Sequence, residues 1–383
     1  MNFKLFLPII ISGCVFIIFL LLPSSLFEKP LKATDIKERR LSLDDEVLKG
    51  TSIQNCMWAS DAYYPIFGSS ELEKDDPFSP GIVLDQRQTG YTPFLVGAGG
   101  STDLIQMMSI GAQYDQLKGK KLAIIISPQW FTRKGLTNVN FDARHSKLQM
   151  NQLFQQDKMP LELKIRFAKQ VSRFKAMKDN DYLQSLIETK TLPEEPFLSS
   201  FEAHNLNKID AIKSNFTIHN QKAPVMKVEP VTTKDMPYKE MQQLAEDYGQ
   251  KQTSSNAFKI RDEYWDLIKA NKRKINRNHE FRTKSKEYDD LALLVDTLHE
   301  AEADALFIVI LTNGKWYDHI GIKKERRDKV YDKITSTIKK HHGKVYDMTD
   351  KDYEPYVVSD AVHIGYKGYV YINERIEQHM KEK

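Results

Sequence analysis

Two continuous apolar runs, Leu122–Ile126 and Leu306–Leu311, constrain the fold of this chain more than any other feature. A strand with one wet face alternates apolar and polar residues, whereas a strand covered on both faces is apolar throughout. Three further strands are expected at Ala62–Phe67, Phe94–Val96 and Lys344–Met348, with helical spacing of apolar residues between strands. This alternation predicts an α/β fold, a three-layer sandwich with a mostly parallel five-stranded sheet.

The sequence divides into three parts. Leu5–Leu22 is nearly all apolar and, at about 1.5 Å per residue, is just long enough to cross a bilayer. We therefore expect a cytoplasmic tip and transmembrane anchor over 1–27, then a stalk and first helix over 28–60. One large domain fills 61–383, and its polar stretch at about 141–286 interrupts the strand–helix alternation and is expected to be a helical insertion.

Charges around the apolar segment leave its orientation open. The segment is followed by a poor cleavage site at Leu22–Leu26, which favours an uncleaved anchor. Only Lys4 and the amino terminus precede it, and five cations follow it, namely Lys29, Lys32, Lys37, Arg39 and Arg40. That excess favours a cytoplasmic domain, but long domains can be exported regardless of flanking charge.

Composition narrows the chemistry. A net charge of +4 over 383 residues is small, so no nucleic-acid partner is expected. The sequence has neither a glycine-rich phosphate loop nor cysteine and histidine residues at metal-binding spacing, and we expect no cofactor and no metal. Of the two cysteines, Cys14 lies in the apolar segment, which leaves Cys56 without an expected disulfide partner.

A serine follows the first expected strand. Gly68 permits a sharp turn, Ser69 or Ser70 could cap a following helix, and Glu71 suits the positive end of that helix. A serine at this carboxyl edge would lie beside free backbone N–H groups that can stabilise an oxyanion. Ser70 is therefore a candidate nucleophile, although the same tripeptide also fits a plain turn with a cap.

Its expected partners lie near the end of the chain. Asp360 and His363 are three residues apart, which in a tight turn puts both side chains on one side. The carboxylate could hold the imidazole in the tautomer that leaves its other nitrogen free to act as a base. A surface turn is the alternative for this pair. The order of Ser70 and then Asp-x-x-His resembles that of the GDSL/SGNH hydrolases.

Other polar or aromatic residues follow strands at the same edge. A backbone N–H of Gly99 or Gly100 could point at Ser70, and the Gln129 amide could donate a hydrogen bond there. A tight loop and a solvated glutamine are the alternatives. Aromatic residues that could wall a substrate pocket, or else lie in the core, are Trp130 and, after the fourth strand, Trp316 and Tyr317.

One stretch is strongly basic. Lys269–Lys286 contains eight lysines and arginines, with Glu280 as its single carboxylate. A solvated helix face is the simpler interpretation. The alternative is a patch that attracts an anionic polymer or lipid headgroups.

Four motifs, in this order, resemble those of the DltD family, the membrane-anchored D-alanyl transfer proteins of teichoic-acid D-alanylation in Gram-positive bacteria. They are Phe67–Leu72, Ser127–Phe131, Asn313–Tyr317 and Asp360–His363. The resemblance implies an SGNH-hydrolase-like catalytic domain over 61–383, held outside the cell by a single-pass anchor. It also implies that Ser70 is the nucleophile, His363 the base and Asp360 the carboxylate that orients it.

The implied reaction places D-alanine esters on lipoteichoic acid, with a D-alanyl donor and other membrane proteins of the pathway as partners. The alternatives are an esterase or thioesterase acting on a D-alanyl carrier or envelope polysaccharide, and a non-catalytic scaffold of the D-alanylation complex. The chain departs from the broader SGNH pattern, which has Gly-Asp-Ser in place of Gly68-Ser69-Ser70 and an asparagine donor after the third strand. Gln129 is the candidate substitute for that asparagine.

Overall fold

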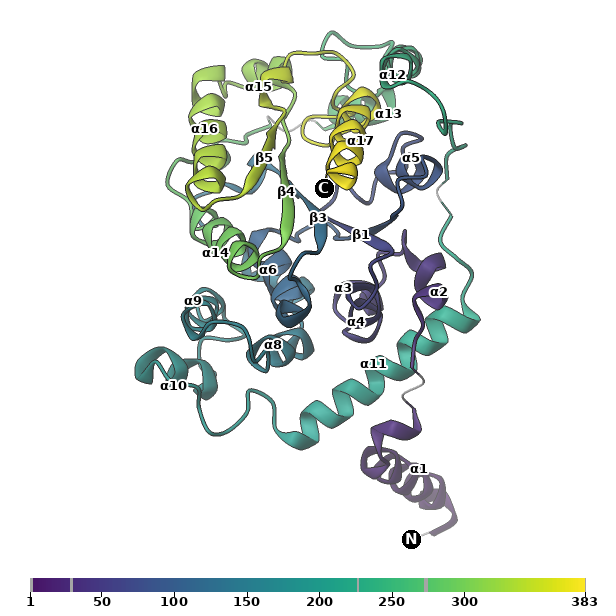
Figure 1. Cartoon of the computed structure of the whole chain (residues 1–383), viewed down its shortest axis with the longest axis vertical. Helices are drawn as coiled ribbons and strands as arrows, with labels where there is room; N and C mark the ends of the chain where they lie inside the picture. The colour runs from purple at the N-terminus through teal and green to yellow at the C-terminus, as the bar shows by residue number, and fades with distance from the viewer. Residues whose placement is uncertain (1–2, 28–29, 226, 272–274, 383) are drawn as a thin grey trace.

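Five parallel strands form the centre of the protein (Figure 1). The computed structural model describes residues 3–27, 30–225, 227–271 and 275–382. The strand order is β2-β1-β3-β4-β5, and every neighbouring pair is parallel. Their bounds are β1 (Tyr63–Phe67), β2 (Thr92–Val96), β3 (Lys121–Ile126), β4 (Asp304–Val309) and β5 (Lys344–Asp347). The predicted α/β class with a five-stranded parallel sheet is confirmed.

The apolar runs are buried on both sides of this sheet. In β3, Leu122, Ile124 and Ile126 face one hydrophobic cluster, whereas Ala123 and Ile125 face a second one. All five side chains are inaccessible to solvent. Successive side chains of a strand point to opposite faces, so only an uninterrupted apolar run can fill both clusters.

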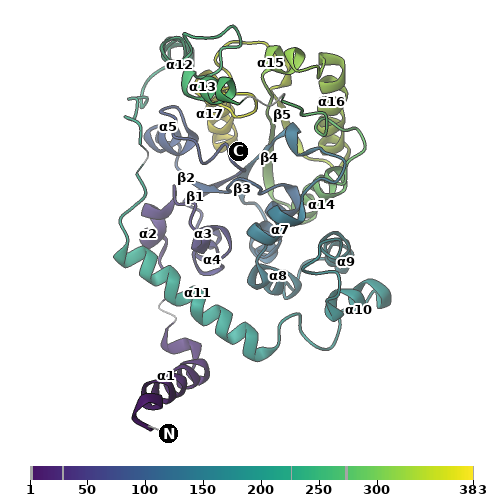
Figure 2. The same ribbon diagram turned by 180° about the vertical axis from the view of Figure 1, so that it is seen from behind.

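Helices cover both faces and give three layers (Figures 1 and 2). The larger cluster lies under α6 (Asp103–Gly111), α14 (Glu287–Glu300) and α16 (Lys324–Lys340). The opposite cluster lies under α5 (Pro80–Gln86), α12 (Tyr238–Gln252) and α17 (Tyr366–Lys381). The apolar side chains of each helix face the sheet, and their burial supplies most of the driving force for folding.

The chain between β3 and β4 is helical. Before α14, its α-helices are α7 (Asn138–Arg144), α8 (Lys147–Phe154), α9 (Leu161–Val171), α10 (Asp181–Thr189), α11 (Ser200–Asn220), α12 and α13 (Asp262–Ala270). Leu153, Leu163 and Leu186, from α8 to α10, join the larger cluster, while Met241 of α12 joins the opposite one. This part of the chain therefore reaches both faces of the sheet.

The N-terminal helix α1 (Phe3–Leu21) lies beyond α11 at one end of the molecule (Figure 1). Lys208 of α11 donates to the Phe19 carbonyl at 2.7 Å, while Val15 and Leu21 of α1 are 60% and 70% exposed. Within the described ranges, none of the helices has the length and hydropathy that a membrane-spanning segment requires. The anchor expected over 1–27 stays a prediction.

Short helices connect α1 to the sheet. They are η1 (Ser24–Leu26), α2 (Ala33–Ile36), η2 (Lys37–Arg39), α3 (Asp45–Leu48) and α4 (Ser52–Trp58). The helices α2, η2, α3 and α4 all lie within the segment 28–60. Residues 28 and 29 of the expected stalk lie outside the described residues.

Two glycines meet where β1 and β2 end. The strands pair along their whole length, from Tyr63 with Thr92 to Phe67 with Val96. Just beyond, Gly97 has φ +153, and a Cβ there would lie 2.0 Å from the carbonyl oxygen of Gly68. Only glycine permits this approach, which fixes the start of the turn that carries Ser70.

We expect Gly97→Ala to destabilise the protein far more than Gly119→Ala. Gly119 also has a positive φ, +72, but a Cβ there would meet nothing within 4 Å. The control should therefore cost only the backbone strain, about 1–2 kcal/mol, whereas Gly97→Ala adds a collision with backbone. Thermal unfolding of the full-length variants measures the difference. Equal losses would show that the contact between Gly97 and Gly68 is unimportant.

Candidate active site

The strand order reverses between β1 and β3. From β1 the chain crosses to β2 on one side, and from β3 onward it continues to β4 and β5 on the other. In open parallel sheets, ligands bind outside the carboxyl ends of the strands where the order reverses in this way. Ser70 follows the end of β1 at this point, and the turn with Asp360 and His363 precedes α17.

The three residues predicted to be catalytic meet at this edge. Ser70 Oγ lies 2.8 Å from His363 Nε2, and His363 Nδ1 lies 2.7 Å from Asp360 Oδ2. Ser70 and His363 are 293 residues apart in the sequence. Both distances are those of hydrogen bonds, and all three residues are partly buried. Hydroxyl, imidazole and carboxylate are thus connected in the order that serves a serine nucleophile.

The turn that carries His363 is held by hydrogen bonds between its own residues. Asp360 Oδ1 accepts the backbone N–H groups of Val362 and His363, each at 2.8 Å, and an antiparallel bridge pairs Val358 with Ile364. Burial acts to raise the pKa of Asp360, but hydrogen bonds and charge attraction from His363 hold this pKa below its ordinary value. The carboxylate is therefore ionised and can hold a proton on His363 Nδ1.

The turn holding Ser70 differs from the expectation. Residues 69–73 form consecutive turns and not the start of a helix, so the predicted cap at Ser69 or Ser70 is wrong. Glu71 folds back instead, and its Oε1 accepts the N–H of Ser69 at 2.6 Å. Ser69 Oγ donates to the Ala98 carbonyl at 3.2 Å. Ser69 is thus used structurally, and Ser70 is the serine that meets the histidine.

Helix α17 is attached to the turn after β1 by buried contacts. Tyr369 Oη donates to the Glu71 carbonyl at 2.5 Å, and Asp76 Oδ2 accepts the N–H of Tyr366 at 3.0 Å. Burial raises the pKa of Asp76 to about 6. Sequence reasoning missed Asp76. The pair Asp76-Pro77 is a local signal for a turn, but nothing nearby in sequence indicates its contact with α17.

Two more residues that sequence reasoning missed hold the histidine turn. The N–H of Arg261, at the start of α13, donates to the Ser359 carbonyl at 2.8 Å, and its Nε donates to Tyr366 Oη at 2.7 Å. The N–H of Asn313, after β4, donates to the Ala361 carbonyl at 2.9 Å. Together with Asp76, which binds the start of α17, these residues position the turn from three separate segments of the chain.

The glycine loop after β2 lies beside Ser70. A Cβ at Gly99 would lie 3.6 Å from that of Ser70. The Gly99 N–H donates to Glu73 Oε2 at 2.7 Å, and its carbonyl accepts from Arg144 Nε at 2.8 Å. Gly100 has φ +91 and packs against α7. The loop has the predicted position, and the oxyanion role of Gly99 and Gly100 stays a prediction.

The aromatic residues expected to wall a pocket are mostly inside the core. Trp130, in η4 (Pro128–Trp130), is 8% exposed, and Trp316, in α15 (Gly314–His319), is 5% exposed. Tyr317 is fully buried and donates to Glu280 Oε2 at 2.6 Å. Large aromatic rings gain most by complete burial, which explains the difference from the expected open wall. Gln129 is partly exposed at the predicted edge.

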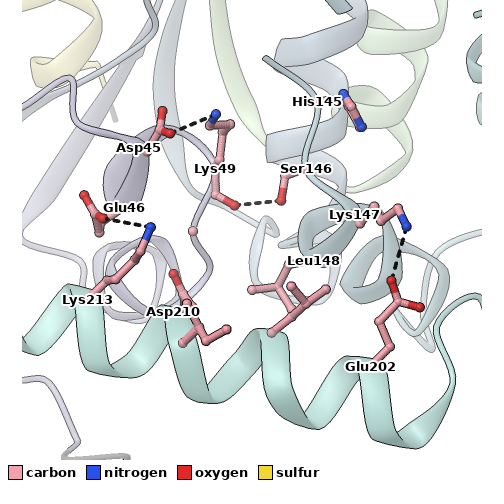
Figure 3. Close-up of a pocket in the computed structure, with 13 residues that line it drawn as sticks. Asp45, Glu46, Lys49, His145, Ser146, Lys147, Leu148, Glu202, Asp210 and Lys213 are labelled. Atoms are coloured by element: carbon pink, nitrogen blue, oxygen red, sulfur yellow. Dashed lines mark hydrogen bonds and ion pairs between the residues drawn. The ribbon is translucent and has the colours of Figure 1, made fainter. Parts of the chain in front are cut away.

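A separate cavity of about 460 Å³ lies between α3, α8 and α11 (Figure 3). Three of the four carboxylates that line it pair with lysines, and the fourth, Asp210, accepts hydrogen bonds from Thr51 and Ser52. Lys49 lies 2.9 Å from Asp45, Lys147 lies 3.2 Å from Glu202, and Lys213 lies 4.0 Å from Glu46. The cavity therefore offers little net charge to a ligand. Among the described residues, no three His, Cys, Asp or Glu side chains are grouped to hold a metal.

Comparison with known proteins identifies one family that matches this chain. The family model described as DltD protein matches residues 40–381. Protein DltD of Staphylococcus aureus (strain NCTC 8325 / PS 47) is 52% identical, covering 100% of this chain and 97% of its own length. Protein DltD of Bacillus subtilis (strain 168) is 32% identical, with 100% and 98% covered. Protein DltD of Lacticaseibacillus rhamnosus is 26% identical, with 98% and 90% covered.

These matches extend over nearly the whole chain, including both segments that meet at the carboxyl edge of the sheet. The chain belongs to the DltD family.

Proposed function

We propose that this protein is a serine acyltransferase that places D-alanine esters on lipoteichoic acid. The observation that carries the proposal is the connected arrangement of Ser70, His363 and Asp360, with contacts of 2.8 and 2.7 Å. Its position at the strand-order reversal supports a substrate site there. We infer the identity of the acyl group and of its acceptor from the motif resemblance to D-alanyl transfer proteins. We also propose that the domain has an SGNH-hydrolase-like fold.

The reaction has two halves. Ser70 Oγ attacks the carbonyl carbon of the D-alanyl donor while His363 Nε2 takes the hydroxyl proton, and Asp360 stabilises the imidazolium. The bond to the donor breaks, and the leaving group receives that proton. A hydroxyl of the polymer then gives its proton to His363 and attacks the seryl ester. The D-alanyl ester of the polymer forms, and Ser70 regains a proton.

The negative oxygen formed in each half needs hydrogen-bond donors. Gly99 and Gly100 are the candidates, since their loop lies beside Ser70. The Gly99 N–H is engaged by Glu73, an exposed side chain that can turn away when substrate enters. Gln129 is a further candidate donor at this edge. Each such donor contributes about 3 kcal/mol of transition-state stabilisation in serine hydrolases.

The proposed location is the outer face of the cell membrane. Exposed apolar side chains of α1, including Val15 and Leu21, support attachment through the N-terminal segment. The proposed partners are lipoteichoic acid, a D-alanyl donor and other membrane proteins of the pathway. Protease treatment of intact protoplasts tests this. Complete protection of the domain from the protease would contradict an external location.

Ser70→Ala should abolish both labelling by a serine-directed fluorophosphonate probe and D-alanine ester in the cell wall. Ser69→Ala is the matched control, because it removes only the 3.2 Å bond to Ala98 and leaves the nucleophile in place. Probe fluorescence on gels and ester analysis of cell walls measure the two effects. Normal ester levels with Ser70→Ala would refute the nucleophile role. Release of free D-alanine by the purified protein would instead favour hydrolysis.

Asp360→Asn should slow probe labelling by about 10³–10⁴-fold, because an amide favours the wrong tautomer of His363. The fold should survive, since the Asn oxygen can still accept from Val362 and His363. Labelling rates, compared at equal melting temperature, provide the measurement. A rate close to that of the unchanged protein would show that Asp360 does not orient the histidine.

A further inference from the structure

A second cavity, of about 690 Å³, lies between the loop after η4 and the segment that leads into α14. Four of its lining residues are cations, Arg133 and Lys134 from one side and Arg282 and Lys284 from the other. Three threonines and His279 complete the lining. The N–H of Arg282 donates to the Phe131 carbonyl at 2.8 Å, which joins the two segments. We refer to this feature as the basic cavity.

The positive charge of the basic cavity is unbalanced. Among the described residues that line it there is no carboxylate, and the four cations are exposed. Glu280 is nearby in sequence but buried, where it binds Arg277 at 2.6 Å and Tyr317 at 2.6 Å. The cavity in Figure 3 is the useful contrast, because its lysines pair with carboxylates. The basic cavity therefore attracts anions.

Contacts connect the basic cavity to the candidate active site. Thr137 caps α7 by accepting the N–H of Asn140 at 3.2 Å. Asn140 in turn lies against Gly100, where a Cβ would be 3.0 Å from its Cγ, and the adjacent Gly99 lies beside Ser70. One short helix, α7, thus lies between the cavity and the glycine loop beside Ser70.

The segment that carries Arg282 is also connected to the candidate active site. Arg277 begins the segment that supplies Arg282, and it lies over the Tyr317 ring at 5.8 Å. Burial acts to lower the pKa of Arg277, but Glu280, Tyr317 and the charge of Asp360 raise it above its ordinary value. The Arg277 guanidinium therefore interacts electrostatically with the Asp360 carboxylate. The segment that lines this side of the cavity therefore begins within electrostatic reach of Asp360.

The cavity is remote from the apolar end of the molecule. Exposed Phe201 and Phe216 of α11, each 57% exposed, lie on the helix that contacts the end of α1. Helices α7 and α14 lie away from α1 along the long axis (Figure 2), and Figure 1 shows the same for α14. A site for lipid headgroups would share a surface with such apolar side chains. This arrangement favours a polymer over a membrane as the occupant.

We propose that the basic cavity binds the phosphodiester groups of a linear acceptor polymer and holds a hydroxyl of a neighbouring unit near Ser70. The proposal rests on the proposed function for its acceptor. Arginines bind phosphate oxygens through two parallel hydrogen bonds, lysines add point charges, and threonine hydroxyls donate to further oxygens. The hollow between two segments lets several phosphates contact cations at once.

The test measures binding without chemistry. The probe is poly(glycerol phosphate) freed of its lipid and its esters, added to the full-length protein in detergent micelles. Replacing Arg133, Lys134, Arg282 and Lys284 with glutamine should weaken binding by about tenfold or more and flatten its salt dependence, because fewer counterions are released. The matched control replaces four exposed lysines elsewhere, Lys118, Lys158, Lys339 and Lys340, with glutamine. It has the same net charge and should bind like the unchanged protein.

Equal affinity of the basic-cavity variant and the control would overturn the proposal. So would a result in which the variant loses binding only to phosphatidylglycerol vesicles and keeps binding to the polymer. If the fourfold variant melts early, the pairs Arg133→Gln/Lys134→Gln and Arg282→Gln/Lys284→Gln are measured separately. Each double variant should then reduce the affinity and the salt slope by an intermediate amount. If neither double variant reduces them, the proposal is refuted.

Failure of the proposed function would be seen separately. Ser70→Ala should bind the polymer with unchanged affinity, because the hydroxyl takes no part in anion binding. Normal wall ester with Ser70→Ala, together with weak binding by the basic-cavity variant, would refute the acyl transfer and keep the polymer site. Loss of wall ester with Ser70→Ala, together with unchanged binding by the basic-cavity variant, would support the acyl transfer and refute the polymer site.

Discussion

The attachment of α17 to the turn after β1 is the interaction on which the candidate active site depends. Three buried hydrogen bonds form it, from Tyr366 to Asp76, from Tyr369 to Glu71 and from Asn373 to Phe78. The helix begins three residues after His363, so its position sets that of the imidazole. Losing one partner of a buried hydrogen bond costs about 1–3 kcal/mol. The same contacts therefore stabilise the fold and align the candidate catalytic groups.

The sequence predicts the sheet well because its signal is local. Leu122–Ile126 is apolar at every position, and only a strand between two layers accommodates that pattern. Ser70, Asp360 and His363 could be selected because each follows such a strand or forms a short motif. The turn at Ser69 could not, since Glu71 closes it with a side-chain hydrogen bond that competes with a helix. The ties from α17 connect residues almost three hundred positions apart, and no local pattern encodes them.

Charge shows the same division between local and long-range information. The sequence marks Lys269–Lys286 as basic, and the fold separates its members. Arg277 is bound to Glu280, whereas Arg282 and Lys284 face the basic cavity, and residues 272–274 lie outside the described residues. The other half of the cavity, Arg133 and Lys134, comes from a loop that carries no such run. The two small groups of cations come together as one basic cavity only in the folded protein.

The long separation of Ser70 from His363 also has a consequence for synthesis. A growing chain displays its serine early, yet the imidazole arrives only when the last helix is being made. Until then the Ser70 hydroxyl lacks the His363 ring that lies 2.8 Å from it in the folded protein. Docking of the final helix is therefore the last step in assembling the candidate active site, and under the proposed acyl transfer a nascent chain would have no activated serine.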